Sequence, residues 1–391
     1  MYPTISDLMK DIFGIYIPLP IQSFGFFVAV SFVIAAWLVM LELKRKEKNG
    51  VVSAQKKKIL VGKPASIPEL LLITIIGFVL GFKLLGIIFD YSFFVENPQN
   101  FILSSEGSII GGIIGAVVAA YFRYREKQKH KLVKPRWDEV EVHPYELTGN
   151  IIIYGALFGI IGAKIFNSFE NIDDFINDPV DALLSFSGLT FYGGLIMAAI
   201  AIIWYAGKNK IPALVISDVA APAIMIAYAV GRIGCQMAGD GDWGIVNTLA
   251  KPDWLRFLPD CLWSYDYPHN VLNEGSQIAD CVGKHCSHLV PPVFPTPLYE
   301  TIVCTLFFFV LWGIRKRINT TGIMFSIFLI MNGFERFFIE KIRVNTKYHI
   351  FGNQITQAEI ISTLLFIAGI ALLVYVLRKK KRREIVSREK G

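Results

Sequence analysis

The stretch PALVISDVAAPAIMIAYAVGRIGCQMAGDGDWG, residues 212–244, decides how the chain folds. Between Pro212 and Arg232 the only charged side chain is Asp218, and after Arg232 the sequence changes to a glycine-rich acidic loop. A helix from Pro212 to Arg232 is roughly 30 Å long, which matches the hydrocarbon thickness of a bilayer. The pattern predicts a membrane-spanning helix with Arg232 near one membrane surface. Asp218 lies about 21 Å from Arg232 along this helix, so we expect it to serve the opposite helix end.

Similar apolar stretches recur along the whole chain of 391 residues, of which 53% are apolar and 30 are phenylalanine. A helix satisfies its own backbone hydrogen bonds, so helices are the spanning elements expected of such a chain. We predict an all-α polytopic membrane protein with about nine transmembrane helices and an outer loop domain. The predicted spans are 20–41, 66–90, 108–122, 149–168, 190–206, 212–233, 298–314, 322–340 and 357–377.

Basic residues divide the connections between these spans into two groups. Lysine and arginine gather in 42–65, 123–136, 208–210, 315–317 and the tail from Arg378, whereas 91–106 and 169–187 contain neither. By the positive-inside rule the basic connections and the carboxyl terminus are cytoplasmic. The amino terminus and the loop 235–297 are then outside. Solvated inner flanks account for the net charge of +7, so we expect no nucleic-acid partner.

The sequence contains an internal echo with an offset of 81 or 82 residues. LGFKLLGIIFDY (80–91) resembles IGAKIFNSFEN (161–171), and SEGSIIGGIIGA (105–116) resembles SGLTFYGGLIMA (187–198). The pattern indicates a repeated two-helix hairpin, although chance recurrence of glycine and isoleucine is the alternative. The predicted segments are an outer lead-in (1–19), the first span and inner loop (20–65), an extra hairpin (66–130), core spans (149–234), an outer loop domain (235–297), further core spans (298–377) and a basic tail (378–391).

A second charged group is predicted near the outer membrane surface. In NGFERFFIEKIRVN (332–345), Arg336, Glu340 and Arg343 share one helix face. Charges at this depth should face the bundle interior, where they pair or bind a ligand. Arg232 and Arg336, from two helices, together suit a phosphate held by fork-shaped donors, such as a phospholipid headgroup. The alternatives are a structural ion pair for Arg336 with Glu340 and an interfacial anchor for Arg232.

Four motifs carry a family resemblance: GLTFYGGLI (188–196), residues 217–244 of the opening stretch, PTPLYE (295–300) and GFERFFIE (333–340). In this order they resemble the prolipoprotein diacylglyceryl transferase family from about residue 20 onward, with 66–130 as an insertion. The GDGDWG form is similar to Bacteroidetes-type members. The resemblance implies transfer of a diacylglyceryl group from phosphatidylglycerol to the lipobox cysteine of a prolipoprotein signal peptide, with release of glycerol phosphate. It also implies a multi-pass protein among the lipids of the bacterial inner membrane.

The resemblance also implies which residues form the site. The catalytic positions are Arg232, Arg336, Glu340, Asp240 (where a glutamate is usual) and Tyr192 (where many members have a histidine). The positions implied for binding phosphatidylglycerol are Arg232, Gly193, Gly194, Gly234, Gly239, Tyr299, Glu300 and Arg343. Two positions depart from the family pattern: Cys235 replaces a frequent asparagine and Phe24 a frequent tyrosine. These departures leave the proton path open.

The reaction needs a deprotonated thiol and a stabilised phosphate leaving group. A free thiol has a pKa of about 8.5, so it requires a base or a positive field. Candidate bases are Tyr192, Asp240 and Glu340. We favour electrostatic activation by Arg232 and Arg336, with Glu340 orienting Arg336. Neither a metal nor another cofactor is required.

Two questions stay open in the sequence. The outer loop contains Cys261, Cys281 and Cys286, which favour one disulfide, with free thiols or a metal site as alternatives. The rival function is a transporter, or another headgroup transferase, that binds an anionic phospholipid through the same arginines. The Tyr-Gly-Gly element and the acidic loop favour the diacylglyceryl transferase, because a transporter needs neither at one membrane face.

Overall fold

The computed structural model describes residues 1–96, 98–179, 183, 188, 190–350 and 353–389. It divides the chain into two units. The first contains Met1–Ile15, Ile21–Ser53 and Pro144–Gly391, and the second contains Tyr16–Pro20 and Ala54–His143. The candidate functional residues predicted from the sequence all belong to the first unit.

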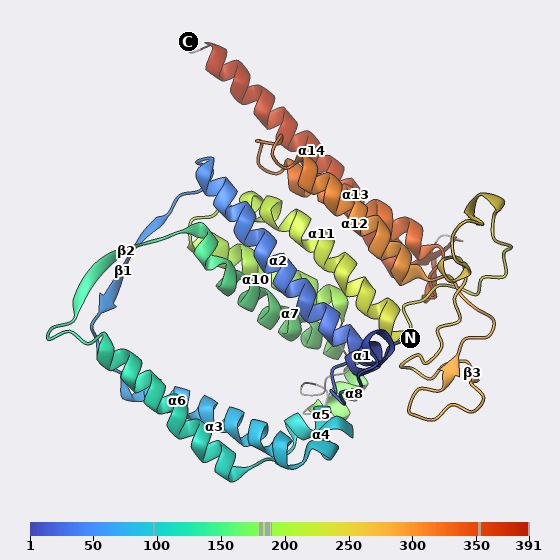
Figure 1. The fold of residues 1–391 in the computed structure, drawn as a ribbon. Helices are drawn as coiled ribbons and strands as arrows, with labels where there is room; N and C mark the ends of the chain where they lie inside the picture. Colours follow the sequence, from blue (N-terminus) through green and yellow to red (C-terminus); the bar gives the residue numbers. More distant parts are fainter. Residues whose placement is uncertain (97, 180–182, 184–187, 189, 351–352, 390–391) are drawn as a thin grey trace. The chain divides into compact units, whose positions relative to one another are not determined.

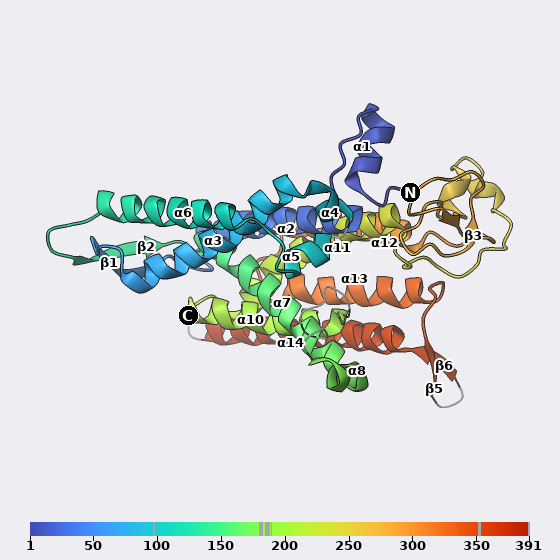
Figure 2. The same cartoon turned by 90° about the horizontal axis from the view of Figure 1, so that it is seen from below.

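The first unit is a helical bundle built around α11, Ala213–Ala238 (Figures 1 and 2). Half of the residues in the most apolar stretch of α11 are buried, whereas at most 28% are buried in the corresponding stretches of the other candidate spans. It packs against α2, α12 and α13, while α10 packs on α7 and α13 on α14. The remaining long helices are α2 (Ser23–Lys48), α7 (Thr148–Glu170), α10 (Phe191–Lys208), α12 (Thr296–Ile314), α13 (Ile323–Glu340) and α14 (Gln357–Glu389), and the short ones are α1 (Ile5–Phe13) and α8 (Ile172–Asn177).

The prediction of an all-α polytopic membrane protein is confirmed. Within the described residues, each predicted span coincides with one long helix, including α3 (Ile67–Phe89) and α6 (Ile109–Lys129) of the second unit. Seven of the described helices are long and apolar enough to cross a membrane by length and composition. The other two, α6 and α13, carry more charge: α6 ends in basic residues, and α13 contains Glu335, Arg336 and Glu340.

Both ends of α11 are fixed by polar contacts. Buried Asp218 accepts hydrogen bonds from the backbone N–H groups of Gly322 (2.7 Å) and Phe325 (2.9 Å), so it caps the start of α13. The sequence predicted that Asp218 serves a helix end and not Arg232, and the end that it serves is that of α13. At the other end, Gly239 has a left-handed conformation (φ 64°), and its N–H donates to the carbonyl of Cys235 at 2.9 Å. This glycine turns the chain out of the helix and into the acidic loop.

The second unit contains the hairpin of α3 and α6, which pack through glycines. A Cβ on Gly81 would lie 2.2 Å from the carbonyl oxygen of Gly111, so the two backbones touch. In the first unit, a Cβ on Gly162 of α7 would lie 2.5 Å from the carbonyl oxygen of Gly193 of α10. The two glycine pairs stand at equivalent positions in the echoed sequences. The same close approach therefore occurs in both hairpins.

The sequence did not predict the strands that flank this hairpin. Strand β1 (Gln55–Val61) pairs antiparallel with β2 (Arg136–Val142), where only basic inner connections were expected. Lys58 faces Glu139 in this register, with 3.8 Å between their charged atoms. The short elements α4 (Tyr91–Glu96) and α5 (Pro98–Leu103) join α3 to α6.

The segment between α11 and α12, residues 239–295, folds into a small unit that we call the cap. Its core consists of Trp243, Tyr267, Leu289 and Val293. Its described regular elements are the turns η2 (Asp253–Leu255) and η3 (Asp260–Leu262) and the strands β3 (Ser276–Gln277) and β4 (Ser287–His288). A second small hairpin, β5 (Lys347–Ile350) and β6 (Asn353–Thr356), lies between α13 and α14.

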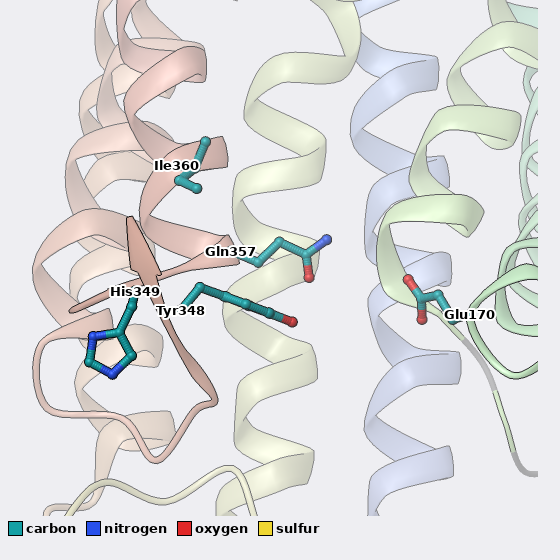
Figure 3. A pocket seen from close by; sticks show the side chains of 5 residues that line it. All are labelled: Glu170, Tyr348, His349, Gln357 and Ile360. Carbon is teal, nitrogen blue, oxygen red and sulfur yellow. The ribbon is translucent and has the colours of Figure 1, made fainter. Parts of the chain in front are cut away.

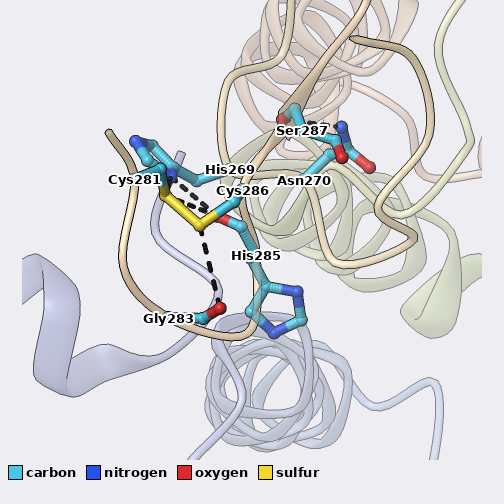
Figure 4. Close-up of a disulfide and its surroundings, with 7 residues drawn as sticks. All are labelled: His269, Asn270, Cys281, Gly283, His285, Cys286 and Ser287. Carbon is cyan, nitrogen blue, oxygen red and sulfur yellow. Dashed lines mark hydrogen bonds between the residues drawn. A yellow bond between two sulfur atoms is a disulfide. The ribbon is translucent and has the colours of Figure 1, made fainter. Parts of the chain in front are cut away.

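A disulfide closes the tip of this cap, between Cys281 and Cys286 (Figure 4). The predicted disulfide is confirmed, and the alternative of a metal site at Cys281 and Cys286 is wrong because the bridge uses both sulfurs. Cys261 is free and exposed.

Candidate active site

Arg232 lies two turns before the end of α11, and its side chain is only 14% exposed. Its Nη1 and Nε atoms form ion pairs with Asp242 and Glu300, respectively. Its Nη2 also contacts the Tyr228 hydroxyl oxygen at 3.2 Å, with the guanidinium over the Tyr228 ring. The acidic partners come from the loop after the helix and from α12, which a search along one helix could not reveal. Arg232 is therefore held inside a polar cluster.

Glu300 is the centre of this cluster. It lies near the start of α12, its side chain is fully buried, and it faces three arginines. Besides Arg232, its Oε1 lies 3.1 Å from Nη1 of Arg336 and 3.4 Å from Nη1 of Arg343. Burying a carboxylate without partners is very costly, and the three guanidinium groups supply those partners for Glu300.

The predicted stripe on α13 brings its three residues to the same cluster. Arg336 Nη2 lies 3.3 Å from Glu340 Oε2, as the i,i+4 spacing indicates. Glu340 Oε1 also accepts a hydrogen bond from Asn345 at 2.5 Å. Arg343, just beyond the helix, is 8% exposed and forms an ion pair with Asp242. We call the six residues of these ion pairs the arginine cluster: Arg232, Arg336, Arg343, Glu300, Glu340 and Asp242.

The acidic loop contributes Asp242 to the arginine cluster, whereas the sequence pointed to Asp240. Asp242 forms ion pairs with Arg232 and Arg343, and its backbone N–H donates to Asp240 Oδ1 at 3.4 Å. Gly241, between the two acids, has φ 93°, a left-handed conformation that favours glycine. Asp240 instead approaches Cys235.

The pKa values of the two carboxyl groups of the loop are shifted in opposite directions. Burial raises the pKa of Asp240, and the negative charge of Asp242 raises it further. Burial also acts to raise the pKa of Asp242, but the charges of Arg232 and Arg343 outweigh it and hold that pKa below its usual range. The pKa of Asp242 therefore lies below that of Asp240.

Tyr192 stands at the beginning of α10, in the first turn, and reaches Arg336 of the cluster. Its hydroxyl interacts with the Arg336 side chain and lies in the field of Glu340 and Arg343. The glycines that follow it serve packing: a Cβ on Gly193 would lie 2.4 Å from the Phe166 Cβ, and one on Gly194 would lie 3.0 Å from the Gly159 carbonyl oxygen. These contacts hold α10 against α7 and so fix Tyr192.

Three other residues implied by the motifs also have partners within the protein. The Tyr299 hydroxyl donates to the carbonyl oxygen of Leu262 at 2.9 Å, which ties α12 to the cap. A Cβ on Gly234 would lie 3.1 Å from the Phe24 Cα, so this glycine lets α2 approach α11. Gly239 ends α11. The structure thus assigns these three a supporting position around the cluster.

Two further groups lie beside the cluster: Glu335, which sequence reasoning missed, and Cys235, which it noted only as a departure from the family pattern. Glu335, next to Arg336 on α13, is buried, and both of its carboxyl oxygens lack a hydrogen-bond partner among the described residues. The Cys235 sulfur lies 3.6 Å from both Arg232 Nη1 and Asp242 Oδ2. Consecutive residues of a helix point in directions about 100° apart, so the spacing that joins Arg336 to Glu340 does not predict a place for Glu335 in the cluster.

Cys235, Asp240 and Asp242 offer ligand-type atoms within 4.8 Å of one another. Two arginines already neutralise Asp242, and Arg232 adds its positive charge beside the thiol. A cation would have to compete with these guanidinium groups, so we assign no metal site here.

A separate pocket of about 780 Å³ lies between the end of α7, the β5–β6 hairpin and the start of α14 (Figure 3). It is lined by Glu170, Tyr348, His349, Gln357 and Ile360. Glu170 accepts a hydrogen bond from Thr190 at 2.8 Å, two residues before Tyr192. The lining described for this pocket includes no member of the arginine cluster.

Comparisons with known proteins agree with the motif pattern. The chain matches the family model described as prolipoprotein diacylglyceryl transferase over residues 10–138 and 129–375. A phosphatidylglycerol–prolipoprotein diacylglyceryl transferase of Leptospira interrogans is 28% identical over 258 residues, covering 60% of this chain and 70% of the relative. Proteins of the same description from Vibrio vulnificus (28% over 239 residues, 60% and 76% covered) and Burkholderia multivorans (25% over 279 residues, 69% and 89% covered) are also similar.

Proposed function

The chain belongs to the prolipoprotein diacylglyceryl transferase family, and we propose that its arginine cluster is the active site at which the diacylglyceryl group is transferred. The protein transfers this group from phosphatidylglycerol to the cysteine thiol of a prolipoprotein. The observation that carries the site assignment is the convergence of three arginines from α11 and the α13 region on one buried carboxylate, Glu300.

The cluster suits the phosphate of the lipid substrate. Guanidinium groups bind phosphate oxygens through paired donors, and here Glu300 and Glu340 hold those groups in place before any ligand arrives. Asp242, with 32% of its side chain exposed, marks the side of the cluster that a ligand can reach. We assign this side to the phosphate, and the buried Glu300 side to support of the arginines.

The same groups can lower the barrier of the chemical step. The thiolate sulfur forms a bond to the terminal glycerol carbon of the diacylglyceryl group, and the bond from this carbon to the phosphate oxygen breaks. The electron pair of that bond leaves with glycerol phosphate, so negative charge grows on the phosphate oxygen. Donors fixed toward this oxygen, Arg232 foremost, stabilise the transition state by about 3 kcal/mol each.

The membrane context follows from the family and from the basic connections. The chain is a multi-pass bacterial membrane protein. We place it in the inner membrane with its amino terminus and the cap outside and its carboxyl terminus inside, because lysine and arginine gather in the opposite connections. In this orientation the arginine cluster lies near the outer surface, where it can meet membrane phosphatidylglycerol and the lipobox cysteine of an exported signal peptide.

The decisive experiment uses the purified protein, phosphatidylglycerol in detergent micelles and a synthetic lipobox peptide. We expect the peptide mass to increase by one diacylglyceryl group, and glycerol phosphate to appear in equal amount. A peptide with serine in place of cysteine is the matched control and should stay unmodified. If the cysteine peptide also stays unmodified while labelled phosphatidylglycerol moves between vesicle leaflets, the chain is a lipid transporter and the proposal is wrong.

A further inference from the structure

Asp242 bridges two arginines in the way that a bound phosphate would. Its Oδ2 pairs with Arg232 and its Oδ1 with Arg343, so one planar anion joins α11 to the segment after α13. A phosphate with two free oxygens offers the same pair of acceptors to the same two guanidinium groups.

The charges of the arginine cluster are already balanced. Its ion pairs join three arginines to three carboxylates, Glu300, Glu340 and Asp242. A lipid phosphate brings one more negative charge, and like charges at this distance repel each other. Binding of the phosphate therefore favours the departure of one carboxylate. Asp242 is the one that can leave, because its side chain is 32% exposed whereas Glu300 and Glu340 are fully buried.

The backbone around Asp242 is anchored, so only its side chain has to move. The Asp242 carbonyl accepts a hydrogen bond from the Thr296 hydroxyl at 2.7 Å. Two residues later, the Gly244 N–H donates to the Phe294 carbonyl at 2.8 Å. Rotation of the Asp242 side chain toward its exposed side leaves the loop in place and keeps the carboxylate at the mouth of the site.

We propose that Asp242 is the counter-ion of the empty site and, once the lipid phosphate has displaced it from Arg232 and Arg343, the base that accepts the proton of the substrate thiol. The proposal rests on the proposed function. The thiol S–H bond gives its proton to an Asp242 oxygen and its electron pair to sulfur. The resulting thiolate attacks the glycerol carbon, and glycerol phosphate leaves. Lipid binding thereby creates the base, so the thiol is activated only when its partner is in place.

The surroundings of Asp242 support this order of events. The groups that face it are Arg232 and Cys235 of α11, Asp240 of the loop and Arg343 after α13, with Glu300 of α12 behind the arginines. The two arginines hold the pKa of Asp242 down, so their engagement by a phosphate removes the cause of that lowering. Burial raises the pKa of Asp240, the other carboxyl group of this loop.

The test compares Asp242→Asn with the wild type in the micelle assay at about pH 7 and about pH 9.5. The variant cannot accept the proton, so its kcat should fall about a hundredfold at about pH 7. Its KM for phosphatidylglycerol should fall several-fold, because the lipid no longer competes with a carboxylate. A thiol with a pKa of about 8.5 is about 3% ionised at the lower pH and about 90% at the higher one. The kcat deficit should therefore shrink to about threefold at about pH 9.5.

Two further variants complete the design. Asp242→Glu keeps a carboxylate and should retain kcat within about tenfold of the wild type. Asp253→Asn removes an acid that is 84% exposed on the cap and should leave both constants unchanged. The proposal is wrong if Asp242→Asn matches the wild type, if its KM rises with the same kcat deficit at both pH values, or if it cannot be purified folded, since Asp242 would then be a structural clamp. An inactive wild type would instead refute the proposed function.

Discussion

Replacement of Arg232 with lysine tests whether the shape of the side chain matters as well as its charge. The guanidinium reaches three groups at once: Glu300 through Nε, Asp242 through Nη1, and the Tyr228 hydroxyl through Nη2 at 3.2 Å. A lysine ammonium is a single compact donor and cannot hold Glu300 while it also presents paired donors to a phosphate. The lysine variant therefore loses at least one donor to the transition state. We expect its transfer rate to fall at least a hundredfold, which corresponds to about 2.7 kcal/mol in the barrier.

The assay is the mass increase of the lipobox peptide, followed over time at saturating phosphatidylglycerol. Arg256→Lys is the matched control, because Arg256 lies on the cap with 76% of its side chain exposed and should tolerate lysine. Thermal unfolding in detergent shows whether the Arg232→Lys protein is folded. If a folded Arg232→Lys protein keeps more than a tenth of the wild-type rate, Arg232 is an interfacial anchor, and Arg336 and Arg343 are the residues that stabilise the transition state.

Three further expectations concern other parts of the molecule. Lys83→Ala and Glu106→Ala should leave the transfer rate within about tenfold of the wild type, or about 1.4 kcal/mol, because their hairpin, the first copy, lacks the tyrosine that the second copy has. Lys83→Ala should nevertheless speed proteolysis of the turn between α5 and α6, where Lys83 donates to three backbone carbonyls. In intact cells a membrane-impermeant maleimide should label Cys261 without reduction, whereas a tag at residue 52 should stay inaccessible; labelling of both from outside would contradict the orientation. Asp218→Ala should lower the free energy of unfolding by about 1–2 kcal/mol, measured by thermal unfolding in detergent, because two capped N–H groups lose their acceptor.

The spans could be predicted from the sequence because their signal is local. A run of apolar residues about as long as a bilayer is thick is helical whatever surrounds it, so each predicted span coincides with a described helix. The role of Asp218 was predictable for a similar reason, since its depth along α11 already excluded Arg232 as a partner. The β1–β2 pairing was not predictable in this way, because its lysine-rich and acidic strands lie about 80 residues apart in the chain.

The candidate site was predictable in its arginines and less so in its acids. Helix spacing alone joins Arg336 to Glu340, and both were predicted. The choice between Asp240 and Asp242 depends on the path of the backbone through Gly241, which has a positive φ. One sequence shows that glycine permits this turn, but it does not show which acid the turn will aim at the arginines.

Glu300 shows why a motif can identify a residue and still leave its task open. The motif suggested a residue that touches lipid, yet this carboxylate is fully buried and faces three arginines. If Glu300 were absent, only Glu340 and Asp242 would balance the three arginines, and the unbalanced positive charge would push the arginine side chains apart. The arginines could then meet a phosphate only after reorganisation, which weakens transition-state stabilisation. The division of labour inferred for this cluster follows: the buried acid keeps the arginines together, and the exposed acid gives way to the substrate.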